Sequence, residues 1–251
     1  MISIRKITCA IAALALSTGL VYAESGGTQQ DTRAMEVLAE MSAFTGALDK
    51  VVINAVAFSD ARLDQGLMVA NSTEIEVVMN RPGSMLINSF DGVATKGLYF
   101  HEEMLTVFNS ETMYYAQADI PGDIDDGMAF ALENLGVEAP LMDLLSRKTS
   151  TNLITPEVTV LYLTDNSRVG GVDCHHIALR GPDSDVQIWI EEGDRPVPRK
   201  LMITSKWEGG SPRFWANLQW DTERKIDTKV FEFKAPESAT KIEFVVDSSQ
   251  P

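Results

Sequence analysis

Apolar and polar positions change their period three times along this chain of 251 residues. In residues 31–46 the apolar side chains recur at spacings of three and four, which predicts a helix with one buried face. Asp31 or Thr32 can cap its start, and Gly46 ends it. Between Val51 and Ala118 the period shortens towards two, and this pattern predicts five or six strands. The turns between them are expected at four short segments, 60–62, 81–83, 91–92 and 109–110.

The helical period returns after Pro121. Three aspartates within residues 123–126 place negative charge where the first amides of a helix are free, and Gly136 stands at its stop position. Pro140 can open a second, shorter helix with two basic residues at its C-terminal end. We therefore expect two amphipathic helices in the middle of the chain.

The period shortens again beyond Thr155. The connections there are too short to hold a crossover helix, so most neighbouring strands should be antiparallel. The whole pattern predicts an α+β fold of about ten or eleven strands, and two helices in mid-chain can serve as a movable cover over a curved sheet. The strands expected in this last part are 158–163, 172–180, 186–191, 199–207, 213–220 and 230–233.

Residues 1–23 have the form of a signal peptide, with a basic start, an apolar run over 7–20 and small residues before the expected cleavage after Ala23. We expect residues 24–30 to form a flexible leader. No linker or repeat divides the remainder, so 31–251 should form a single domain. No later segment approaches the roughly 20 apolar residues that a membrane span requires. The chain should therefore be exported, and the mature protein should lack a transmembrane segment.

The mature chain is strongly acidic. Cleavage removes two basic residues and no acidic one, so 19 basic residues face 36 acidic ones, a formal charge of −17. Such a surface repels nucleic acid and anionic lipid, which excludes a nucleic-acid partner. The excess of acidic residues can serve to keep an exported protein soluble. Alternatively, it can form an acidic surface that binds a basic partner. Only Cys174 remains after processing, so no internal disulfide can form, and we expect a monomer.

One cluster, Cys174-His175-His176, could carry catalysis or bind a metal. On a strand, Cys174 and His176 project to one face and His175 to the other, so two of the three at most can meet one metal. Zinc sites need three or four ligands, and a thiol–imidazole pair needs a third group to orient it. We interpret the cluster as structural, and we expect no catalytic residue, no metal and no cofactor.

Several segments carry a resemblance to a known superfamily. A strand that ends in Arg-Pro, a following Asp-Gly turn and a closing Phe-x-Phe-x-x-Pro segment stand in the same order as in the periplasmic lipoprotein carriers, and the chain resembles this LolA/LolB-like superfamily. The stretches 172–180, 185–190 and 198–200 more closely resemble a family of predicted periplasmic proteins of unknown function, grouped with that carrier. The carrier-like segments are Glu76-Val77-Val78-Met79-Asn80-Arg81-Pro82-Gly83, Asp91-Gly92 and Phe231-x-Phe233-x-x-Pro236-x-x-Ala239.

The resemblance implies a periplasmic protein with an incomplete, curved antiparallel barrel, covered by an N-terminal helix and two lid helices around an apolar cavity. Arg81 matches the arginine that holds the lid of the carrier shut until a lipidated guest displaces it. Five donors in a fixed fork suit this role, because they can bond the carbonyls at helix ends. Methionines in the lining would adapt to different apolar guests. The expected cavity and lid residues are Met35, Leu38, Met41, Met79, Met128, Leu132, Leu135, Leu141, Leu144 and Leu145.

The first functional hypothesis is a periplasmic binding or carrier protein for an apolar small molecule, lipid or lipoprotein acyl chain. The second is an envelope sensor or regulatory module that binds a partner protein through the same curved sheet. The third and least favoured is a hydrolase that uses acids which no motif reveals. An enclosed apolar void favours the first, an exposed apolar edge or patch the second, and perturbed carboxylates in a polar cleft the third.

Overall fold

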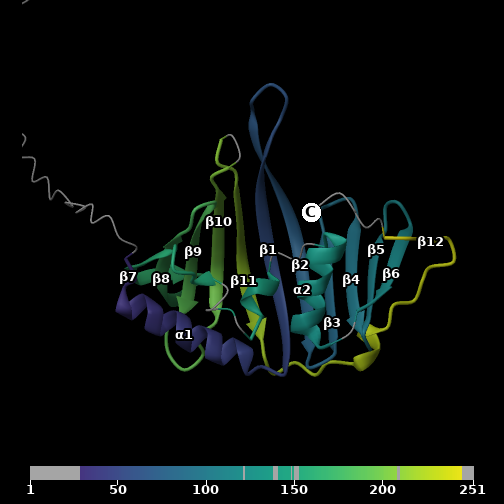
Figure 1. The fold of residues 1–251 in the computed structure, drawn as a ribbon, viewed down its shortest axis with the longest axis horizontal. Helices are drawn as coiled ribbons and strands as arrows, with labels where there is room; N and C mark the ends of the chain where they lie inside the picture. The colour runs from purple at the N-terminus through teal and green to yellow at the C-terminus, as the bar shows by residue number, and fades with distance from the viewer. Residues whose placement is uncertain are drawn as a thin grey trace, which may run out of the picture.

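The computed structural model describes residues 29–120, 122–137, 141–147, 149, 153–207 and 210–244. All twelve strands in this part of the chain belong to one curved, unclosed sheet, and the helices α1 and α2 lie on the same face of it (Figure 1). The strand order is β12-β6-β5-β4-β3-β2-β1-β11-β10-β9-β8-β7. The expected signal peptide, residues 1–23, and residues 24–28 of the expected leader lie outside the described residues.

The first six strands confirm the short period read between Val51 and Ala118. The expected turn at 60–62 is wrong, because these residues continue β1, which pairs with β2 as far as Arg62 opposite Met68. Asp60 is held there by Arg213 of the neighbouring strand, whose Nε donates to its carboxylate at 2.9 Å. The strands are β1 Lys50–Arg62, β2 Met68–Asn80, β3 Ser84–Phe90, β4 Thr95–His101, β5 Met104–Asn109 and β6 Tyr114–Asp119.

Five of the six strands expected beyond Thr155 are confirmed. The sixth, at 230–233, is wrong: its first residues belong to a 3-10 helix, η2 Thr228–Phe231, capped by Asp227. This tight turn buries Phe231 against the face of the sheet opposite α1 and α2. The last strand follows later in the chain and pairs parallel to β6. These strands are β7 Thr159–Val169, β8 Val172–Arg180, β9 Ser184–Glu191, β10 Pro198–Ser205, β11 Arg213–Asp221 and β12 Thr240–Ile242.

The two halves of the sheet meet at a single seam. β1 pairs with β2, its neighbour in sequence, and on its other side with β11, where Val52 lies opposite Asp221. At the outer edge of β7, Gln29 and Asp31 hydrogen-bond to the backbone of Val160, so the end of the expected leader adds to that edge.

Two helices follow the sequence signals closely. α1 spans Thr32–Gly46, and the side chain of Asp31 accepts a hydrogen bond from the amide of Ala34. α2 spans Ile124–Leu135, begins at the cap Asp123 and ends at Gly136, which takes the left-handed conformation that glycine tolerates best. None of the helices in the described part of the chain has the length and apolar character needed to cross a membrane.

The prediction of a second lid helix is wrong. In place of the α-helix expected from Pro140, residues Met142–Leu144 form a single 3-10 turn, η1. Backbone groups that a longer helix would use itself are bonded elsewhere. The carbonyl of Leu145 accepts a hydrogen bond from Arg81, and the amide of Arg147 donates to Asp125 at 3.4 Å. The described residues between 122 and 147 therefore hold one α-helix and one short turn where two lid helices were expected; Pro140 itself lies outside the described residues.

Strand alternation separates two faces of the sheet. The inner face, which carries α1, α2 and η1, contributes residues such as Ile53, Val77, Met85 and Phe100 to one large hydrophobic core. Each long apolar side chain buried there stabilises the fold by about 1.5–3 kcal/mol. The outer face is polar over much of its area, and the segment from Ile226 to Phe233 packs on it around Val52, Val78 and Leu86.

Candidate functional site

Arg81 lies where β2 ends, between the sheet and the segments that cover it. Its amide donates to the carbonyl of Asp49 at 2.7 Å, which fixes the backbone. Its side chain is only 1% exposed. One terminal nitrogen, Nη1, donates to Oδ2 of Asp125 at 2.7 Å, and the other, Nη2, donates to the carbonyl oxygen of Leu145. A single buried cation thus joins the sheet to two separate segments, α2 and residues 141–147, which we call the cover.

Local interactions place both partners of this cation. Asp125 lies in the first turn of α2, where the Asp123 side chain accepts from its amide at 3.0 Å. The amide of Ile124 donates to the carbonyl of Pro82 at 3.0 Å, so the residue after Arg81 also contacts the helix start. The Nε of Arg81 is buried and has no hydrogen-bond partner among the described residues. Both terminal nitrogens of Arg81 are therefore hydrogen-bonded, whereas its Nε has no partner among the described residues.

α2 lies directly on the sheet at Gly127. A Cβ at this position would lie 2.7 Å from Cε2 of Phe100, closer than side chains approach one another. Phe100 itself has no exposed surface. The glycine therefore sets how closely the cover approaches the core.

Most of the expected cavity residues come together in space. One of them, Leu132, is 54% exposed on α2 and does not face the sheet. Met35 and Leu135 pack at the margin of the core. The others belong to the core itself, which lies beneath the cover; they are Leu38, Met41, Met79, Met128, Leu141, Leu144 and Leu145. Their role in binding a ligand stays a prediction.

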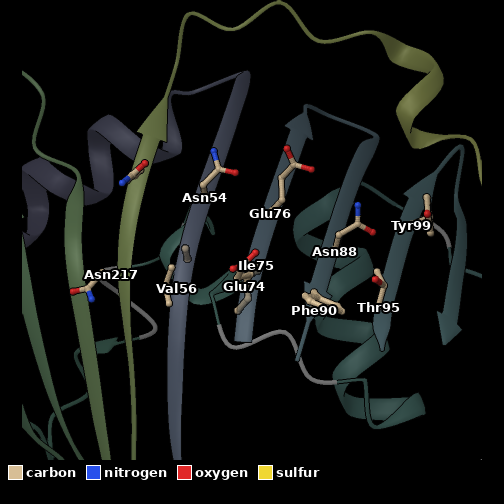
Figure 2. A pocket seen from close by; sticks show the side chains of 12 residues that line it. Asn54, Val56, Glu74, Ile75, Glu76, Asn88, Phe90, Thr95, Tyr99 and Asn217 are labelled. Carbon is tan, nitrogen blue, oxygen red and sulfur yellow. The ribbon is translucent and has the colours of Figure 1, made fainter. Parts of the chain in front are cut away.

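A cleft lies on the outer face of the sheet, which sequence reasoning did not single out (Figure 2). Its volume is about 690 Å³, and five neighbouring strands contribute to it: β11, β1, β2, β3 and β4. Polar residues at alternate positions of each strand were the available signal, but the same pattern is typical of any solvated sheet face. We call it the outer cleft; its lining residues are Asn54, Ala55, Val56, Glu74, Ile75, Glu76, Asn88, Phe90, Thr95, Tyr99, Asn217 and Gln219.

One wall of the outer cleft is held in place by close packing. A Cβ at Gly97 would lie 2.7 Å from Cε2 of Tyr99 and 3.4 Å from Oδ1 of Asn88, so the glycine makes room for both side chains. The Tyr99 ring also packs against Phe233, with 5.2 Å between the ring centroids. Burial raises the pKa of Tyr99 above its ordinary value, which keeps its hydroxyl neutral. At the other side, Glu76 lies 3.4 Å from Arg224.

The Cys174-His175-His176 cluster is divided between the two faces, as expected. Cys174 is fully buried, and burial raises the pKa of its thiol. His175 hydrogen-bonds to the hydroxyl of Tyr162 at 2.7 Å, whereas His176 bonds to Gln187 at 3.0 Å and stacks on Trp189. Burial lowers the pKa of His176. Among the described residues, no three His, Cys, Asp or Glu side chains converge as a metal site would require.

Comparison with known proteins gives a family and a set of distant structural neighbours. The sequence profile of the family described as "Predicted periplasmic protein (DUF2092)" matches residues 34–245. No curated protein matches the chain significantly. Among solved structures, LprF from Mycobacterium bovis is similar with a TM-score of 0.47 and 10% identity, over 84% of this chain and 100% of that one.

Two further solved structures are similar at lower scores. A LolA superfamily protein from Nitrosomonas europaea has a TM-score of 0.33 and 12% identity, over 80% of this chain and 97% of that one. MucB, solved in complex with MucA(peri), has a TM-score of 0.38 and 13% identity, over 81% of this chain and 59% of that one.

Proposed function

The chain belongs to the family of predicted periplasmic proteins, and from this location and the geometry at Arg81 we propose that it binds and carries an apolar ligand beneath the cover. The proposed ligand is a lipid or the acyl chain of a lipoprotein. In this proposal the protein works by opening and closing the cover and not by making or breaking bonds.

The observation that carries the proposal is the pair of hydrogen bonds from Arg81 to Asp125 and to Leu145. Because one side chain bonds both segments of the cover, displacement of one guanidinium removes a polar anchor from both at once. Arg81 would therefore act as a latch. Its Nε has no partner among the described residues, and this supports reversible closure, since a buried donor without a partner costs the closed form about 1–3 kcal/mol.

The magnitudes are compatible with opening by an acyl chain. Breaking a buried ion pair costs about 3–5 kcal/mol, and each buried CH₂ group of a ligand returns about 0.8 kcal/mol. About five methylene groups therefore offset the loss of the latch. The buried methionines Met41, Met79 and Met128 suit this exchange, because a flexible thioether side chain repacks more easily than a branched one.

The test combines two measurements on protein purified from the periplasm. Native mass spectrometry with lipid extraction should detect a co-purifying lipid, and a fluorescent fatty acid should bind with one-to-one stoichiometry. Arg81→Leu should take up the fatty acid faster than the wild-type protein, whereas Arg147→Leu, which removes an exposed ion pair to Asp123, should not. Recovery of no lipid together with no binding of the fatty acid would reject the proposal.

A second candidate function, binding of a partner protein, is favoured by exposed apolar side chains at two neighbouring hairpin tips. The β1–β2 hairpin projects beyond the strands around it (Figure 1), and Leu63 and Leu67 at its tip are 47% and 59% exposed. Trp207, after β10, is 73% exposed, and Met68 lies close to Gly210 of the same connection. If these residues bind an envelope protein, Leu67→Ser with Trp207→Ser will abolish crosslinking to it and leave fatty-acid binding unchanged. Unchanged crosslinking would reject this candidate.

A further inference from the structure

The outer cleft has features that binding of an acyl chain beneath the cover does not use. We propose that it is a separate binding site for a saccharide, either neutral or carrying an amine. Its volume of about 690 Å³ falls within the range of roughly 300–1,000 Å³ that small-molecule sites occupy. It lies on the face of the sheet opposite α1 and α2, as Figure 2 shows with both helices behind the strands.

Side-chain amides dominate the polar lining. Those of Asn54, Asn88, Asn217 and Gln219 have no hydrogen-bond partner in the part of the chain that the structure describes. Each amide offers two donors and an acceptor, and this combination matches sugar hydroxyls, which both donate and accept. The four amides come from β1, β3 and β11, so together they can bond hydroxyls on different sides of one ring.

The charges in the outer cleft exclude an anionic ligand. Glu74 and Glu76 are its only charged lining residues, and they point to the same side of β2 (Figure 2). Glu74 has no ion-pair partner among the described residues, and Glu76 has only the exposed Arg224 at 3.4 Å. Carboxylates of this kind accept hydrogen bonds from hydroxyl or ammonium groups and repel a phosphate, a sulfate or a uronate.

The apolar part of the lining suits a sugar ring better than a hydrocarbon tail. Tyr99 and Phe90 supply aromatic surface beside the amides, and Tyr99 is fixed between Gly97 below it and Phe233 beside it. An aromatic ring presents apolar area with a fixed direction, against which the C–H face of a saccharide can pack. A long acyl chain would instead leave the surrounding amides and carboxylates without partners, which is unfavourable.

Three variants test the site directly. Asn88→Ala and Glu74→Ala each remove one polar contact, and Gly97→Ala removes no lining side chain but displaces those of Tyr99 and Asn88. Asn134→Ala is the matched control, because Asn134 is an exposed amide on α2, on the other face of the sheet. The probes are the trimers of N-acetylglucosamine, glucosamine and glucose, with trigalacturonic acid as the anionic comparison.

Calorimetry and amide NMR on the full mature chain give the readout. At least one of the three uncharged or amine-bearing trimers should bind, with the dissociation constant raised about tenfold or more by each cleft variant and unchanged by Asn134→Ala. The side-chain amide signals of Asn54, Asn88, Asn217 and Gln219 should shift with saturation. Absence of binding by all three trimers, equal binding by trigalacturonic acid, or equal affinity in folded cleft variants would each overturn the proposal.

Saccharide binding in the outer cleft and fatty-acid binding beneath the cover can be lost independently of each other. Asn54, Glu74 and Asn88 line the outer cleft and face away from the core. The residues that alternate with them along the strands face the core beneath the cover. Saccharide binding should therefore persist in Arg81→Leu, and fatty-acid binding should persist in Gly97→Ala. A loss of saccharide binding in folded Arg81→Leu would contradict the assignment to the outer cleft.

Discussion

The guanidinium of Arg81, at the end of β2, donates a hydrogen bond to the backbone carbonyl of Leu145, 64 residues further along the chain. Its second terminal nitrogen reaches Asp125. The backbone carbonyl of Leu145 cannot be removed by substitution, so mutagenesis can test its hydrogen bond only by replacing Arg81. The guanidinium fork spans two acceptors on different segments, a geometry that a lysine cannot reproduce.

We predict that Arg81→Leu loosens the cover. The free energy of unfolding should fall by about 2–4 kcal/mol, because Asp125 keeps some contact with solvent and loses its partner. Hydrogen exchange in 124–137 and 141–147 should accelerate. Arg81→Lys should give an intermediate result, since it retains the charge but reaches one acceptor. Unchanged protection of these segments in Arg81→Leu would defeat the latch hypothesis.

A second prediction concerns the distance between α2 and the sheet. Gly127→Ala should destabilise the protein by up to about 2 kcal/mol, because overpacking against Phe100 costs about 1–3 kcal/mol and the better helix propensity returns about 1 kcal/mol. Urea denaturation measures the change. Leu132→Ala, at an exposed position of the same helix, should change stability by less than about 1 kcal/mol. A more stable Gly127→Ala variant would show that the helix can move outward freely.

The third prediction concerns pH. Burial lowers the folded-state pKa of His176 below its unfolded value of about 6.5, so the unfolded chain binds more protons in this range. The contribution of His176 to stability is therefore fully present above about pH 6.5 and is lost as the pH falls through that value and below. His176→Gln should show a smaller loss of stability on acidification than the wild-type protein. An NMR titration midpoint for His176 at or above the unfolded value would contradict this assignment.

The fourth prediction concerns the thiol of Cys174. Because the side chain is fully buried and its pKa is raised, iodoacetamide should not modify it in the native protein. Modification should begin in the urea range where the protein unfolds, as followed by mass spectrometry. Cys174→Ala provides the control for site assignment. Rapid labelling under native conditions would mean that β8 opens locally.

Capping chemistry made the long helices predictable from sequence. Asp31, Asp123 and Gly136 each sit where the structure uses them, because caps depend on hydrogen bonds within a few residues. The strand pattern was equally local, and it held for all but one of the expected strands. The resemblance to a known superfamily directed attention to Arg81, and the structure places its guanidinium between the sheet and the cover.

The predictions that were wrong concern segments whose structure depends on residues far away in the sequence. Leu141, Leu144 and Leu145 have a helical spacing, but Arg81 and Asp125 take the backbone groups that a longer helix would need. The segment after Val230 has a strand-like composition, but burial of Phe231 requires a tight turn.

The outer cleft was not predictable for a related reason. Asn217 and Gln219 become neighbours of Asn54 only because β11 pairs with β1, and no local signal in the sequence specifies that pairing. The same holds for Gly97, whose role is visible only once Tyr99 and Asn88 are placed above it.

The seam between β1 and β11 also sets an order of assembly. Val52 pairs with Val78 on one side and with Asp221 on the other, so one edge of β1 can be satisfied early and the other only after most of the polypeptide has emerged. Closing such a distant contact is slow, because the entropy of the long intervening loop must be overcome first. Until then β1 presents an open edge rich in valine and alanine, which can recruit another nascent molecule. Pairing of β11 with β1 therefore removes an aggregation-prone edge only at a late stage of folding.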